Sequence, residues 1–194
     1  MPWFVEGCGH QIAGTRGPNR MSREAVRNPA SPRAHSGLVL GGFLAACFLV
    51  AGVSSTFTIA AIPHWYAALN KPWFNPPNGI FAPVWTLLYA LMAVAAWLVW
   101  KQTASSPPEA ALRTAALRIF WLQLLLNFVW SWIFFRQHQL DAALLEIVVL
   151  WLAIVAATLL FMRVSGLAAG LMLPYVVWVA FATLLNFEIW RLNS

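Results

Sequence analysis

Three polar side chains, Gln123, Asn127 and Ser131, recur at every fourth position along an otherwise apolar stretch. Residues four apart lie on one face of an α-helix, so the three share a face. Amide side chains are costly against lipid, and this face is therefore expected to point into the interior of the protein. There the amides can either bond to neighbouring helices or hold the polar groups of a ligand.

Aromatic residues accompany this polar face. Trp130 borders it, Trp85 and Tyr89 share a face of an earlier apolar stretch, and a later stretch presents Trp178, Ala182 and Asn186 at helical spacing. Trp85 and Trp178 lie deeper than ordinary interface anchors, which makes them the candidates for a pocket. A flat, largely apolar ligand suits a box of such rings with a few amide donors.

The ionisable residues offer little conventional chemistry. Glu146 is the deepest acid and fits either proton coupling or a position near a membrane interface. His64 and His138 fall in connecting segments, and no His or Cys cluster has the spacing of a metal site. We therefore expect no metal and no required cofactor.

A proline-rich aromatic segment separates the first two apolar stretches: residues 63–79, PHWYAALNKPWFNPPNG. Prolines restrict its backbone, and its aromatic rings gain nothing from facing water. We expect the segment to fold over the mouth of the pocket as a lid. It would bring Trp65, Tyr66 and Trp73 to the ligand, with Lys71 as the available cation at the rim.

The composition indicates where this pocket lies. Hydrophobic residues make up 61% of the chain and charged residues 9%, against about 45–50% and about 25% in soluble proteins. Such a chain has too few charges to cover itself in water, whereas lipid requires no charged cover. The net charge is +6, but five of the twelve Lys and Arg lie in the tail next to the first apolar run, where they suit topology control, so we expect no nucleic acid partner.

Five apolar stretches approach the roughly 20 residues that a helix needs to cross a bilayer. We predict an all-α fold, an integral membrane bundle of five transmembrane helices with the aromatic segment as its lid. The predicted helices cover about 37–62, 80–101, 116–135, 141–162 and 165–189. They form a single domain, 37–194, after a disordered basic tail, 1–36.

The positive charges predict the orientation. The tail and the loops on its side of the membrane hold Arg16, Arg20, Arg23, Arg27, Arg33, Lys101, Arg113, Arg118 and Arg163. The opposite side holds Lys71, Arg136 and Arg191. The positive-inside rule then places the N-terminus in the cytoplasm, with the first loop and the C-terminus outside.

The same segments resemble the TspO/MBR family, which comprises the tryptophan-rich sensory proteins of bacteria and the translocator proteins (peripheral benzodiazepine receptors) of mitochondria. The first loop, WYAALNKPWFNPP at 65–77, carries much of the resemblance. It continues through PVWTLLY at 83–89, QLLLN at 123–127, PYVVW at 174–178 and LNFEIWR at 185–191.

The resemblance implies a homodimeric five-helix membrane protein with a pocket for porphyrins, notably protoporphyrin IX, under the first loop. Carried over to this chain, it adds lid residues to the pocket. The expected ligand site comprises Trp65, Tyr66, Lys71, Trp73, Trp85, Tyr89, Asn127, Trp130, Trp178 and Ala182. The small-residue stripe Gly37, Gly41 and Ala45 is the dimer interface we expect.

Three functions stay open. The leading one is a tetrapyrrole-binding sensor or regulator in a membrane, expected to be the bacterial cell membrane. The second is a light-dependent porphyrin-degrading enzyme, because Trp85 and Trp178 match the pair implicated in that photochemistry in some family members. The third is a transporter of porphyrin, lipid or sterol. For the sterol, Leu185, Phe187 and Arg191 form a degraded recognition motif, since the animal proteins have Tyr where this chain has Phe187.

Overall fold

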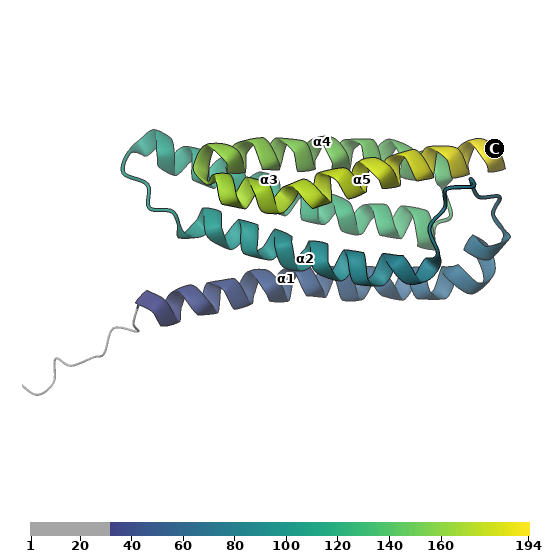
Figure 1. Ribbon diagram of the computed structural model, residues 1–194, viewed down its shortest axis with the longest axis horizontal. Coiled ribbons are helices and arrows are strands. Elements are labelled where there is room, and N and C mark those ends of the chain that lie inside the picture. Colours follow the sequence, from purple (N-terminus) through teal and green to yellow (C-terminus); the bar gives the residue numbers. More distant parts are fainter. Residues whose placement is uncertain (1–31) are drawn as a thin grey trace, which may run out of the picture.

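The computed structural model describes residues 32–194, and this part of the chain forms a bundle of long helices without strands (Figure 1). The elements are α1 (Pro32–Ala61), η2 (Ile62–Tyr66), α2 (Asn78–Lys101), α3 (Pro107–Ser131), η3 (Trp132–Arg136), α4 (Leu140–Val164) and α5 (Gly166–Asn193). Five helices in this range are long and apolar enough to cross a membrane. The predicted all-α membrane bundle is confirmed.

Two helices begin earlier than their apolar runs. α3 begins at Pro107 rather than at 116, because Pro fits the first turn of a helix and the Glu109 carboxylate accepts a hydrogen bond from the Ser105 N–H at 2.7 Å. α1 begins at Pro32, so residues 32–36 are helical instead of belonging to the tail. The remainder of the predicted tail, 1–31, lies outside the described residues.

α1 and α3 each end in a π-helical turn at the same end of the bundle. Pro63 lies inside the first of these turns, η2, and cannot donate a backbone hydrogen bond. The turn extends the first helix through Tyr66 and leaves a shorter irregular lid than predicted, residues 69–77.

The lid is fastened to the C-terminal end of α5. The backbone N–H of Asn70 donates to the Asn193 side-chain oxygen at 2.9 Å, and the Asn193 amide donates back to the Asn70 carbonyl at 2.9 Å. A third bond ties the lid to η2, from the Tyr66 hydroxyl to Asn75 Oδ1 at 2.8 Å. These bonds hold the lid at the end of the bundle where α5 finishes.

The helices differ in how deeply they pack. α4 packs against α3 and α5, whereas α1 packs mainly on α2 and lies along one side of the bundle (Figure 1). Only 11% of the most apolar stretch of α1 is buried, against 28–39% in the other four spanning helices. α1 is therefore a peripheral helix, and it leaves room between itself and the remaining bundle.

The small-residue stripe on α1 faces outward. A Cβ added at Gly37 or Gly41 would meet no atom of the described chain within 4 Å, and Ala45 is exposed. The stripe therefore contributes nothing to packing within one protomer. The homodimer expected through it stays a prediction.

Candidate ligand-binding site

A cavity of about 440 Å³ lies between α1, α2, α3 and α5, and η2 and η3 border it at the lid end. Its size is within the range of sites that hold drug-sized molecules, roughly 300–1,000 Å³. The residues that line it are Phe48, Ala51, Gly52, Ser54, Ser55, Thr58, Ile59, Ile62, Tyr66, Asn78, Phe81, Ala82, Trp85, Thr86, Tyr89, Asn127, Trp130, Ser131, Phe134, Phe135, Trp178, Ala182, Leu185, Asn186 and Ile189.

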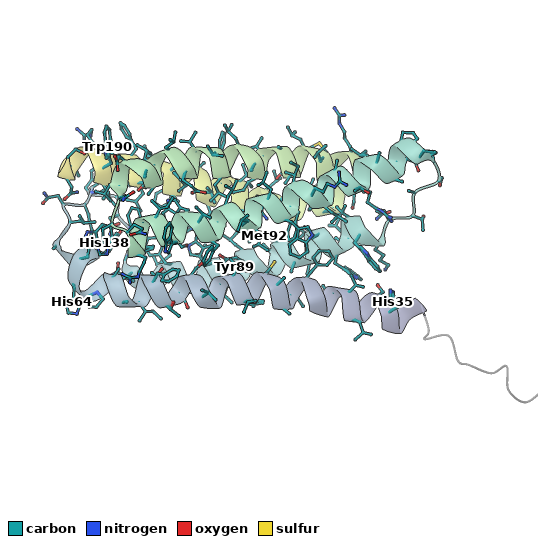
Figure 2. The ribbon with its side chains drawn as sticks, turned by 180° about the vertical axis from the view of Figure 1, so that it is seen from behind. His35, His64, Tyr89, Met92, His138 and Trp190 are labelled. Atoms are coloured by element: carbon teal, nitrogen blue, oxygen red, sulfur yellow. The ribbon has the colours of Figure 1, made fainter. Side chains whose placement is uncertain are left out.

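Most of the predicted ligand residues come together in this cavity. The seven that line it are Tyr66, Trp85, Tyr89, Asn127, Trp130, Trp178 and Ala182. Figure 2 shows Tyr89 inside the bundle, while His64, His138 and Trp190 lie toward the lid end and His35 at the opposite end. The sequence pattern thus located the walls of the cavity on α2, α3 and α5.

Three residues that were predicted to contact the ligand do not line the cavity: Trp65, Lys71 and Trp73. Trp73 is 96% exposed, because the turn at 73–74 points it away from the bundle. Trp65 stacks on His138 with ring centroids 4.2 Å apart. The Lys71 ammonium donates to the carbonyls of Ala67 and Leu69 at 3.2 and 3.0 Å. It also lies 5.0 Å from the centroid of the Tyr66 ring, which lines the cavity, so the cation is near the rim but outside the lining.

The walls of the cavity are aromatic on two sides. Trp85 meets Tyr175 edge to face with ring centroids 6.2 Å apart, and Trp178 meets Phe81 in the same way at 6.0 Å. The rings of Trp130, on α3, and Phe134, in η3, stack at 5.2 Å. Such aromatic contacts fix the ring planes, so the cavity offers preformed apolar surfaces to a flat ligand.

No charged side chain lines this cavity among the described residues. Its polar groups are hydroxyls, amides and indole N–H groups, all of them neutral. A carboxylate inside would lose its hydration without gaining a cation, which is expensive in apolar surroundings. The cavity therefore favours the uncharged part of any ligand.

The polar stripe on α3 is largely used for holding helices together. The Tyr89 hydroxyl donates to Asn127 Oδ1, and Asn127 Nδ2 donates to the Tyr175 hydroxyl at 2.9 Å. Farther along, Gln123 donates to the Met92 sulfur at 3.8 Å. Asn127, only 1% exposed, thus joins α3 to α2 and α5 with both ends of its amide.

The sequence reasoning missed the contribution of α1 to the cavity. Ser54 and Thr58, four residues apart in an apolar stretch, both line it, and that spacing is the signal that could have revealed this wall. Asn186, placed by its spacing on the face of Trp178, also lines the cavity. Glu146 lies on α4, which contributes none of the lining residues.

The three residues of the degraded sterol motif do not share one surface. Leu185 lines the cavity, whereas Phe187 is exposed on the outside of α5. The Arg191 guanidinium pairs with the Glu188 carboxylate at 2.7 Å. The motif therefore does not form a single binding element in this protein.

The Asn127 network makes a prediction for stability. Asn127→Leu leaves the buried hydroxyls of Tyr89 and Tyr175 without this partner, at a cost of about 1–3 kcal/mol for each orphaned group. We expect a lower thermal unfolding temperature in detergent micelles. Adding Tyr89→Phe and Tyr175→Phe should recover part of the loss, because the orphaned hydroxyls are then removed as well. An Asn127→Leu variant as stable as the unmodified protein would show that the network is not structural.

Comparison with known proteins identifies the family of this chain. The TspO/MBR family model matches residues 43–191. The human Translocator protein is 38% identical over 152 residues, which cover 78% of this chain and 88% of that protein. The Tryptophan-rich protein TspO of Chlorobaculum tepidum is 39% identical over 160 residues, covering 80% and 96%. Protein CrtK of Rhodobacter capsulatus is 35% identical over 151 residues, covering 78% and 90%. This multi-pass membrane protein belongs to the TspO/MBR family.

Proposed function

We propose that this protein is a membrane sensor or regulator that binds a tetrapyrrole such as protoporphyrin IX in the cavity beneath the lid. A sensory role is supported by its relatives, one of which, from Cereibacter sphaeroides, is named Tryptophan-rich sensory protein and is 37% identical over 151 residues. The observation that carries the proposal is the uncharged cavity with Trp85 and Trp178 in its walls.

The chemistry of the cavity supports a flat macrocycle. The π-faces of a tetrapyrrole can stack on indole and phenol rings. Inside the cavity, its large apolar area is covered by protein. Because the lining residues carry no cation, the macrocycle rather than its carboxylates provides the binding free energy. A free-base porphyrin needs no metal ligand from the protein.

We further propose that the N-terminus faces the cytoplasm of a bacterial cell and that the lid faces outward. The bonds between Asn70 and Asn193 support the placement of the lid and the C-terminus on one side. At the opposite end, the Arg113 guanidinium donates to the Gln102 carbonyl at 2.6 Å in the loop between α2 and α3. The positive charges expected inside flank this loop, with Lys101 at the end of α2 and Arg113 and Arg118 on α3.

The orientation can be tested by cysteine labelling in a Cys8→Ser background, since Cys47 is buried. Trp73→Cys places a thiol on the exposed lid, and Thr103→Cys places one in the exposed loop between α2 and α3. A membrane-impermeant maleimide should label Trp73→Cys in intact bacteria and Thr103→Cys only after lysis. The reverse pattern would overturn the proposed orientation.

Binding itself is tested by titrating purified protein with protoporphyrin IX and following the porphyrin absorption band. Replacing both Trp85 and Trp178 with Ala removes two ring contacts, each worth about 0.5–1.5 kcal/mol beyond the area it buries, so we expect affinity to fall at least roughly tenfold. Trp73→Ala is the matched control and should bind normally, because Trp73 lies on the outside of the lid. Equal affinity of the double variant and the control would refute the site.

A further inference from the structure

Asn186 differs from Asn127, the other deeply buried amide among the residues that line the cavity. It is 2% exposed on α5 and lines the cavity, yet neither its Nδ2 nor its Oδ1 finds a hydrogen-bond partner within residues 32–194. Buried side-chain polar atoms are nearly always paired, so an amide unpaired at both ends requires an explanation. A structural role would have satisfied it, as the structure does for Asn127.

Asn127 is the internal comparison. It lines the same cavity at 1% exposure, and both ends of its amide are bonded to tyrosine hydroxyls. The bundle can therefore satisfy a buried amide at this depth. The free amide of Asn186 is a local property of its position on α5 and is not a general consequence of burial.

Two other lining groups share this condition. The Trp130 indole N–H and the Ser54 hydroxyl also have no hydrogen-bond partner in the described part of the chain. The lining residues thus include buried donors and acceptors that have no partner, and none of the described lining residues is charged. A ligand group that satisfies them must be neutral, since an ionised group would be left without a counter-charge.

We propose that Asn186 is a specificity-determining residue that pairs with an uncharged ligand group carrying a donor and an acceptor side by side. A carboxamide, a lactam or a protonated carboxylic acid has this pattern, because each presents one polar hydrogen next to one carbonyl oxygen. The Asn186 amide supplies the complementary oxygen and N–H. The inference rests on the proposed function, and for a tetrapyrrole it means that a side-chain acid enters the cavity uncharged.

Three porphyrins that share one macrocycle test the proposal at a single pH. Protoporphyrin IX diamide is neutral and carries a donor and an acceptor, the dimethyl ester is neutral with acceptors only, and the free acid is ionised. We expect the unmodified protein to bind the diamide about tenfold more tightly than the ester, from one added hydrogen bond in apolar surroundings. The ester in turn should bind more tightly than the free acid.

Asn186→Leu removes the amide at nearly constant volume. We expect the preference for diamide over ester to fall to about one, while the ester still binds. The unliganded variant should also unfold at a higher temperature than the unmodified protein, because an unsatisfied buried amide has been replaced by an apolar group. A residue with a structural role would change stability in the opposite direction.

Gln123→Leu is the matched control. Gln123 is a buried amide with an unpaired oxygen among the described residues, but it lies outside the cavity lining, so its removal should leave the diamide preference intact. A preference that survives in Asn186→Leu, or one that is absent from the unmodified protein, would overturn the role of Asn186. Neither result would affect porphyrin binding as such; that proposal fails only if all three porphyrins bind no better to the protein than to detergent alone.

Discussion

The amide of Asn127, bonded at both ends to tyrosines of two other helices, is the contact on which the arrangement of the cavity depends. Inside a bilayer, a polar group that lacks a protein partner has no water to replace it. Tyr89 and Tyr175 must therefore meet Asn127, and in doing so they fix how α2, α3 and α5 face one another. Trp85 lies one turn from Tyr89 and Trp178 close to one turn from Tyr175, so the same contact positions both aromatic walls.

The peripheral position of α1 explains why a cavity exists beside this tight contact. α1 packs mainly on α2 and lines the cavity with small residues such as Gly52, Ser54 and Ser55. These side chains are too short to fill the volume that the tryptophans border. The result is an apolar chamber with neutral polar groups, in which shape and hydrogen bonding replace charge as the means of recognition.

The sequence predicts the bundle well because hydrocarbon imposes a simple rule on length and polarity. Trp85, Asn127 and Trp178 could be assigned to one interior for the same reason, since helical spacing and depth suffice to place them. The lid could not be predicted this way. Trp73 points outward and Lys71 donates to the nearby carbonyls of Ala67 and Leu69, because turn geometry and local backbone groups decide their positions.

The unpaired state of Asn186 was equally beyond the sequence. Its spacing places it on the face of Trp178, just as spacing places Asn127 on the polar stripe, but periodicity does not say whether an opposing helix brings a partner. Asn127 meets two tyrosines, and Asn186 meets none among residues 32–194. Whether a buried amide serves structure or recognition is decided by tertiary contacts.

The central claim, that the cavity itself receives the macrocycle, is tested most directly by filling it. Ala182→Phe adds a ring inside the cavity and keeps every existing side chain around it, whereas Ala180→Phe adds the same ring on the exposed side of α5. Overfilling a packed site costs about 1–3 kcal/mol, which corresponds to a loss of roughly tenfold or more in affinity for protoporphyrin IX. We predict that loss for Ala182→Phe and normal binding for Ala180→Phe. Equally tight binding by the two folded variants would contradict the account.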